Sequence, residues 1–220
     1  DLTLKSLEIA KEAIQESGKD ILLAASLPPL ETSYRSDLIL DSISMDSMYR
    51  ELASILENNV DIIICETMSH SAEARSALAA IQNSNSQKWL GWTLYGNQNT
   101  LPSGETITEA FNAVSDLKCD AYLINCGGVN LITEGIRELR SLTDKRIGGY
   151  GNSEKIEISK EDRSDRPEED HWSSATTITE REYAQETQIW VEEGATIVAG
   201  CCRTRPSHIK ILAETFQENN

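Results

Sequence analysis

The sequence is short of positive charge and contains no long apolar run. Lysine and arginine number 20 against 36 aspartate and glutamate residues, so the formal net charge is −16. This negative field repels phosphate backbones, which argues against nucleic acid as a partner. No apolar run approaches the roughly 20 residues that span a bilayer, and we expect no membrane segment. No signal-peptide pattern is visible either, which predicts a cytoplasmic protein.

The sequence also lacks the closely spaced, even-numbered cysteines of a disulfide framework. Its five cysteines therefore indicate free thiols or metal ligands. Two of them, Cys65 and Cys119, lie in apolar surroundings, and we expect them to pack in a core. No glycine-rich turn follows an early strand, which argues against a dinucleotide-binding sheet.

Strand-like and helix-like stretches alternate along the chain, which predicts one α/β domain covering residues 1–220. The pair Thr179 and Glu182 predicts a capping box at the start of the helix before the last strand. Six apolar runs are typical of buried parallel strands, and they lie at residues 21–26, 60–65, 89–95, 121–125, 146–150 and 195–200.

The polar candidates for function all follow strands, as active-site residues do in a (β/α)₈ barrel. Such a barrel needs eight strands, and this chain begins with a helix. We therefore expect a (β/α)₈ barrel that lacks its N-terminal strand, helix and second strand in this chain. An open barrel exposes two apolar strand edges, so either the sequence lacks an N-terminal segment or something else covers them. Whether the chain forms a homo-oligomer is left open.

Residues 153–174 are rich in acidic and basic side chains and nearly free of aliphatic ones. This composition cannot build a core, so we expect a charged mobile loop within the domain. The segment follows the penultimate strand, which places it on the expected active face as either a lid or a solvated insertion.

Three cysteines follow strand-like runs at that face. Cys126 ends one run, and Cys201 and Cys202 end another. Successive strand residues point to opposite sides, so the backbone must turn for Cys201 and Cys202 to share a metal, and Gly200 makes that turn easier. Three thiolates can hold zinc and leave its fourth position open. The alternative is that these cysteines pack in the core, because spacing alone does not bring Cys126 to the pair.

A zinc ion with three thiolates suits a fourth, substrate thiolate that stays nucleophilic, and the natural partner of such a nucleophile is an alkyl donor. Glu66 follows an apolar strand and either binds a substrate ammonium or makes a helix cap or loop ion pair. Thr67 and Asn152 are candidates to donate hydrogen bonds to a substrate carboxylate. His208 lies in the first turn of the last helix, and we expect it on the surface.

Four segments resemble the homocysteine S-methyltransferase family, and together they cover essentially the whole chain. Residues 190–209 (WVEEGATIVAGCCRTRPSHI) are similar to its closing Gly-Gly-Cys-Cys and Pro-x-His-Ile motif. Asn125 and Cys126 resemble its Asn-Cys ligand site, and residues 61–68 with Glu73 and Ala74 resemble its Glu-Thr strand end. Residues 26–29 and 33–37 resemble a branch of the family without other attached domains.

The resemblance implies a (β/α)₈ barrel, zinc held by Cys126, Cys201 and Cys202, and homocysteine bound through Glu66. It implies a sulfonium or ammonium methyl donor, S-methylmethionine first among them, and methionine as the product. Four features depart from the family: Ala199 replaces the first motif glycine, Gly127 and Gly128 follow Cys126 where a hydroxyl residue is more usual, Gly151 replaces a common proline, and an N-terminal Asp-Gly segment is absent. The alternative is a barrel remnant of the same family that does not turn over alone.

Overall fold

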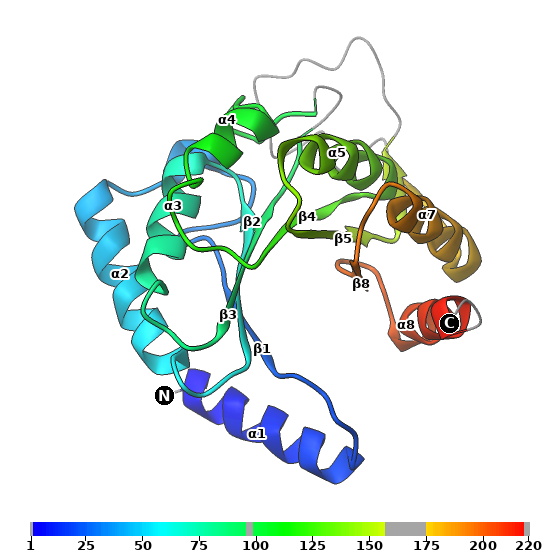
Figure 1. Cartoon of the computed structure of the whole chain (residues 1–220), viewed down its shortest axis with the longest axis horizontal. Helices are drawn as coiled ribbons and strands as arrows, with labels where there is room; N and C mark the ends of the chain where they lie inside the picture. The colour runs from blue at the N-terminus through cyan, green and yellow to red at the C-terminus, as the bar shows by residue number, and fades with distance from the viewer. Residues whose placement is uncertain (1, 96–98, 157–174, 218–220) are drawn as a thin grey trace.

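The computed structural model describes residues 2–95, 99–156 and 175–217, and its strands form one curled parallel sheet (Figure 1). The order across the sheet is β1-β2-β3-β4-β5-β8, and every neighbouring pair is parallel. The strands are β1 (Ala24–Leu27), β2 (Ile62–Met68), β3 (Gln87–Trp92), β4 (Ala121–Gly128), β5 (Arg146–Asn152) and β8 (Ile197–Gly200). The six predicted strands are thus confirmed, with boundaries that shift by a few residues.

The helices lie around the outer side of the curled sheet (Figure 1). They are α1 (Leu2–Ser17), α2 (Ser42–Leu56), α3 (Ser71–Ala80), α4 (Ile107–Asn112), α5 (Val129–Leu142), α7 (Glu180–Glu192) and α8 (Pro206–Gln217), with a short 3₁₀ helix η1 (Ser36–Leu38). The predicted capping box is confirmed, because the Thr179 hydroxyl accepts from the Glu182 N–H while the Glu182 carboxylate accepts from the Thr179 N–H. None of the described helices is both long and apolar enough to cross a bilayer.

The hydrophobic core lies between the sheet and these helices. Alternate strand residues point into it, as the period of a strand requires. They include Ile63 and Cys65 in β2, Leu90 and Trp92 in β3, and Tyr122 and Ile124 in β4. Cys119 is buried in the same core, so the packing role expected for Cys65 and Cys119 is confirmed.

The sheet stays open in the described part of the chain, where β1 and β8 each have a neighbour on one side only. The structure is therefore a half-barrel, and it shows six strands of the predicted (β/α)₈ barrel rather than a closed ring. Ile21 and Leu22, just before β1, are 47% and 57% exposed. Ile21 and Leu22 precede β1 rather than lie in it, so the exposure of apolar strand edges stays a prediction.

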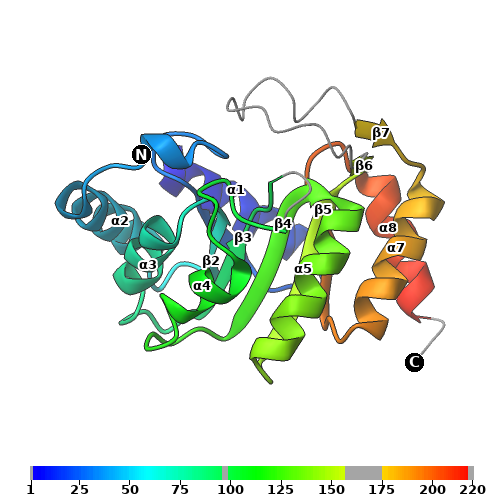
Figure 2. The same ribbon diagram turned by 90° about the horizontal axis from the view of Figure 1, so that it is seen from above.

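The predicted charged loop at residues 153–174 needs a correction at its start. Ser153 is buried, and β6 (Glu154–Ile156) pairs antiparallel with β7 (Ala175–Thr177). Figure 2 shows this ribbon at the end of the molecule that also carries α7 and α8. The high content of charged residues in this segment masked the sequence pattern of a short buried strand. Residues 157–174 of the predicted loop lie outside the described residues.

Replacement of Gly148 by alanine tests the pairing that carries the last strand. A Cβ atom at Gly148 would lie 2.6 Å from the Cβ of Ile197 in β8. We expect Gly148→Ala to lower the free energy of unfolding by about 1–3 kcal/mol, because the two strands must separate to accept it. Urea unfolding measures the loss. Gly127→Ala is the control, since its nearest neighbours would be 3.8 Å away. Equal stability of the two variants would contradict this packing.

Candidate metal centre

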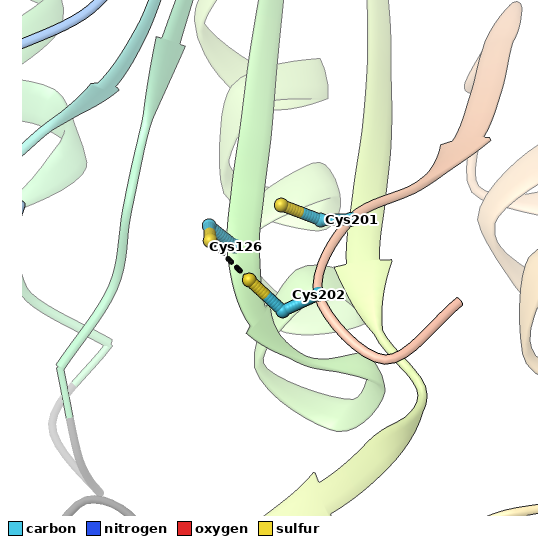
Figure 3. Close-up of side chains that lie close together, drawn as sticks. All are labelled: Cys126, Cys201 and Cys202. Carbon is cyan, nitrogen blue, oxygen red and sulfur yellow. Dashed lines mark hydrogen bonds between the residues drawn. The ribbon is translucent and has the colours of Figure 1, made fainter. Parts of the chain in front are cut away.

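The three predicted cysteines come together at the carboxyl ends of β4 and β8 (Figure 3). Their sulfur atoms all lie within 4.8 Å of one another, and those of Cys126 and Cys202 are 3.7 Å apart. Tetrahedral coordination with metal–sulfur bonds of about 2.3 Å places neighbouring sulfurs about 3.8 Å apart. The three sulfurs therefore fit a thiophilic metal ion and leave one position of a tetrahedron free, which favours the metal site over core packing.

Irregular backbone at the strand ends sets the direction of the cysteine side chains. Cys126 has a left-handed backbone with φ of 59°, and the pairing of β4 with β5 shifts register between Asn125 and Gly128. Such a bulge redirects a side chain at a strand end. We expected Gly200 to ease the turn through its backbone freedom, but it is needed because there is no room for a side chain at this position. A Cβ there would lie 2.7 Å from the Cβ of Thr204, whose hydroxyl donates to the Cys201 carbonyl.

Asn152 joins the two cysteine segments. It is only 3% exposed, and its Oδ1 accepts a hydrogen bond of 3.1 Å from the Cys202 N–H. Its Nδ2 donates to Glu154 Oε1 at 3.0 Å and to the Cys126 carbonyl at 3.4 Å. The amide thus holds the two cysteine segments in place. The hydrogen bond from Asn152 to a substrate carboxylate stays a prediction.

Glu154 extends this arrangement, and sequence analysis missed it because it lies within the charged segment. The carboxylate is 2% exposed and forms an ion pair of 2.8 Å with Arg203, which follows the cysteine pair. Arg203 also has a left-handed backbone, with φ of 63°. This ion pair between a buried carboxylate and an exposed arginine fixes the turn that leaves Cys202.

Glu66 and Thr67 lie at the end of β2, where the pairing with β3 shifts register. Tyr150 donates a hydrogen bond of 2.8 Å to Glu66 Oε2, and no other described residue bonds this carboxylate, which leaves Oε1 available. Thr67 is held by Asn125: its N–H donates to Asn125 Oδ1 at 3.0 Å, and Asn125 Nδ2 donates to its hydroxyl oxygen at 2.8 Å. Gly91 of the intervening β3 makes room, because a Cβ there would lie 2.8 Å from Asn125 Oδ1.

The charge of the three thiols is shared unequally. The hydrogen-bonded Cys201 thiol lowers the pKa of Cys126 to about 6, against the effect of burial and with help from the Tyr34 hydroxyl. The same hydrogen bond, together with burial, raises the pKa of Cys201, and burial with the charge of Cys126 raises that of Cys202. The lowered pKa of Cys126 and the raised pKa of its two neighbours favour ionisation of Cys126 before the other two thiols.

Tyr34, in the segment between β1 and α2, is a site residue that sequence analysis did not identify. Its hydroxyl donates to the Cys126 sulfur at 2.8 Å and to the Cys126 carbonyl at 2.9 Å. The only sequence signal for it was the resemblance of residues 33–37 to one branch of a family.

His208 corrects the expectation of a surface residue, because it is only 5% exposed. Its Nδ1 accepts from the Arg205 N–H at 3.1 Å, and its Nε2 lies 2.9 Å from the Ser153 hydroxyl. The imidazole therefore ties the start of α8 to the segment after β5. Its place in the Pro-x-His-Ile motif was the available signal.

A family model and several curated proteins match this chain. The family model described as homocysteine S-methyltransferase matches residues 1–216. Homocysteine S-methyltransferase 1 of Brassica oleracea var. italica is 29% identical over 84% of this chain and 55% of its own length. Homocysteine S-methyltransferase 3 of Zea mays is 28% identical over 77% of this chain and 48% of its own length. The chain thus spans about half the length of these curated relatives.

Solved structures show the same fold. The metallated form of the homocysteine methyltransferase MmuM from Escherichia coli superposes with a TM-score of 0.75 at 21% identity. That match covers 96% of this chain and 69% of the MmuM chain. The apo form of MmuM gives the same TM-score at 20% identity and covers 72% of that chain. The likeness shows that the half-barrel has the architecture of most of the MmuM chain.

The lowered pKa of Cys126 predicts that this thiol reacts with alkylating reagents at a lower pH than an ordinary cysteine. In reduced, metal-free protein, single-hit alkylation by iodoacetamide at Cys126 should rise with pH to half its maximum near pH 6. The thiolate is the reactive form, so a lowered pKa moves the rise toward acid. Mass spectrometry of the modified peptide measures the rate. Cys202, whose pKa is raised, is the internal control and should react only in alkaline solution. A midpoint for Cys126 above pH 8 would contradict the charge distribution.

Proposed function

Because the chain belongs to the homocysteine S-methyltransferase family, we propose that it methylates the thiol of homocysteine to give methionine. The observation that carries the proposal is the group of three sulfurs from Cys126, Cys201 and Cys202. We propose zinc as the metal, since three thiolates suit a borderline-soft ion with one free position. We propose S-methylmethionine as the donor, and the net charge of −16 attracts such a small cation. The proposed compartment is the cytoplasm, where thiols stay reduced.

Homocysteine carries two groups that match the site, a thiol and an ammonium. In our proposal the thiol takes the free position beside the cysteines, and Glu66 binds the ammonium. Glu66 is near enough to Cys126 for its charge to raise the pKa of that thiol, although the hydrogen bonds to Cys126 outweigh this effect. Tyr150 holds one oxygen of Glu66, so the carboxylate is oriented before substrate arrives. Thr67 and Asn152 remain candidates for the substrate carboxylate.

The transfer itself needs little from the protein beyond position. A zinc ion held by Cys126, Cys201 and Cys202 would lower the pKa of the homocysteine thiol, so that its proton would be released to solvent at neutral pH and the sulfur would stay nucleophilic. The sulfur then attacks the donor methyl in line, a carbon–sulfur bond forms, and the bond to the donor sulfonium breaks to leave a neutral thioether. Holding the two partners in line is therefore the main contribution of Glu66 and of the residues around it.

A second candidate is a chain that binds the metal but does not turn over alone. The open sheet and the exposed Ile21 and Leu22 favour it, because an uncovered apolar edge invites a partner. A stable assembly in solution with no homocysteine binding by calorimetry would support this candidate. A monomer or oligomer that binds homocysteine and turns it over would exclude it.

Metal content tests the cysteine site directly. We expect about one zinc per chain in freshly prepared, reduced protein, and well below about 0.2 in Cys126→Ser and Cys202→Ser, because each loses one of three thiolates. Elemental analysis after gel filtration measures it. Cys119→Ala is the control, since that buried cysteine lies in the core away from the other three. A wild-type content below about 0.2 zinc would contradict the proposed metal.

Substitution of Glu66 by glutamine tests the ammonium site. The charge is lost while the shape is kept, so we expect KM for homocysteine to rise about 10- to 100-fold with zinc content unchanged. Steady-state kinetics separates KM from kcat, and calorimetry of homocysteine binding serves if turnover is slow. Asp61→Asn, just before the start of the same strand, is the control. An unchanged affinity in Glu66→Gln would remove Glu66 from the substrate site.

A further inference from the structure

The three cysteine sulfurs raise a chemical problem that the proposed reaction must solve. A cationic methyl donor beside a homocysteine thiolate is also beside protein thiolates, which are nucleophiles of the same kind. Each of the three sulfurs would be a thiolate when it holds a metal, so each is open to this side reaction. Methylation would turn the ligand into a neutral thioether and damage the metal site.

Tyr34 is the one described side chain with a hydroxyl bonded to a sulfur of this group. The phenol oxygen lies 2.8 Å from the Cys126 sulfur and 2.9 Å from the Cys126 carbonyl. It has a single proton for these two acceptors, and an ionised sulfur is the stronger one. Cys126 is buried, so the hydrogen bond acts in surroundings of low dielectric where it is strong.

The backbone at Tyr34 gives independent support. Tyr34 has φ of 68°, a left-handed conformation that a bulky residue adopts at a cost. Its hydroxyl meets Cys126, which is itself left-handed with φ of 59°. Neither residue is a glycine, so the surrounding structure must hold both conformations. Such strain is typical of residues whose position serves a function.

We propose that Tyr34 keeps Cys126 a ligand rather than a nucleophile. The phenol proton shares the negative charge of the sulfur, and a thiolate stabilised in this way attacks carbon more slowly. The proposal rests on the proposed methyl transfer for its purpose, but the hydrogen bond acts with or without metal. Tyr34 is thus a positioning and protecting residue, and it takes no part in the transfer to homocysteine.

The unwanted step is simple to follow. The Cys126 sulfur forms a bond to the donor methyl, the donor's carbon–sulfonium bond breaks, and the donor leaves as a neutral thioether. The phenol keeps its proton throughout. The product is S-methyl-Cys126, which mass spectrometry detects as an added methyl group on a defined peptide.

Tyr34→Phe removes the hydroxyl and keeps the ring. We expect methylation of Cys126 by trimethylsulfonium or methyl iodide to become about three- to ten-fold faster, from the strength of a charged hydrogen bond and the partial dependence of thiolate reactivity on it. The rate is measured by peptide mass spectrometry on zinc-loaded protein at pH 7.5 and on metal-free protein at pH 9. Methylation of Cys202 in the same samples should not change.

Tyr49→Phe is the matched control. The Tyr49 hydroxyl donates to the Pro28 carbonyl and to Glu73, each at 3.1 Å, so its loss loosens the same part of the chain without touching sulfur. The cobalt-substituted protein gives a further readout: the sulfur-to-cobalt charge-transfer band should move to longer wavelength in Tyr34→Phe and stay in place in Tyr49→Phe. General loosening of the site would not move this band.

Two outcomes would overturn the proposal. One is an unchanged rate at Cys126 in Tyr34→Phe. The other is an equal rise at Cys126 and Cys202, or an equal rise in Tyr49→Phe, since either would reflect exposure rather than a hydrogen bond. The metal-free measurement keeps this test apart from the proposed function, because it stands even if the chain binds no zinc and methylates no homocysteine.

Discussion

One buried amide holds the candidate metal centre together. Asn152 accepts from the N–H of Cys202 and donates toward the carbonyl of Cys126, so it spans two segments that are 76 residues apart in sequence. Its remaining N–H goes to Glu154, whose charge is balanced by Arg203. A buried polar group that loses its hydrogen-bond partner costs about 1–3 kcal/mol, so loss of any one of these bonds would destabilise the whole arrangement. The amide therefore helps to set the distance between the sulfurs of Cys126 and Cys202.

Strain is concentrated where the chemistry is expected. Six described non-glycine residues have a left-handed backbone, and four of them lie at the site: Tyr34, Thr67, Cys126 and Arg203. Each is tied by a specific contact, through Asn125 at Thr67, through Glu154 at Arg203, and through the phenol of Tyr34 at Cys126. Regular strands would point successive side chains to opposite faces. The bulged ends of β2 and β4 instead aim polar and sulfur atoms toward one centre.

The sequence was sufficient to predict the strands, and it placed the cysteines at the carboxyl ends of parallel strands, but only the resemblance to the family implied that Cys126 meets Cys201 and Cys202. It was insufficient where position depends on another part of the chain. His208 is buried because α8 docks against the segment after β5, which helical spacing does not reveal. Ser153 and Glu154 are buried inside a segment whose average composition is charged. Tyr34 reaches Cys126 across 92 residues of sequence, and no local pattern encodes that distance.

The acidity of the thiols and the fit of a metal ion are two consequences of one arrangement. Three sulfurs this close cannot all be negative without a cation, so the structure leaves the charge on Cys126 and raises the pKa of Cys201 and Cys202. A divalent ion reverses that balance, because its charge compensates three thiolates and releases the protons of the other two. Metal affinity must therefore fall as protons compete for Cys201 and Cys202. The hydrogen bond from Tyr34 is directed at the Cys126 sulfur, whose lowered pKa makes it the first of the three thiols to ionise.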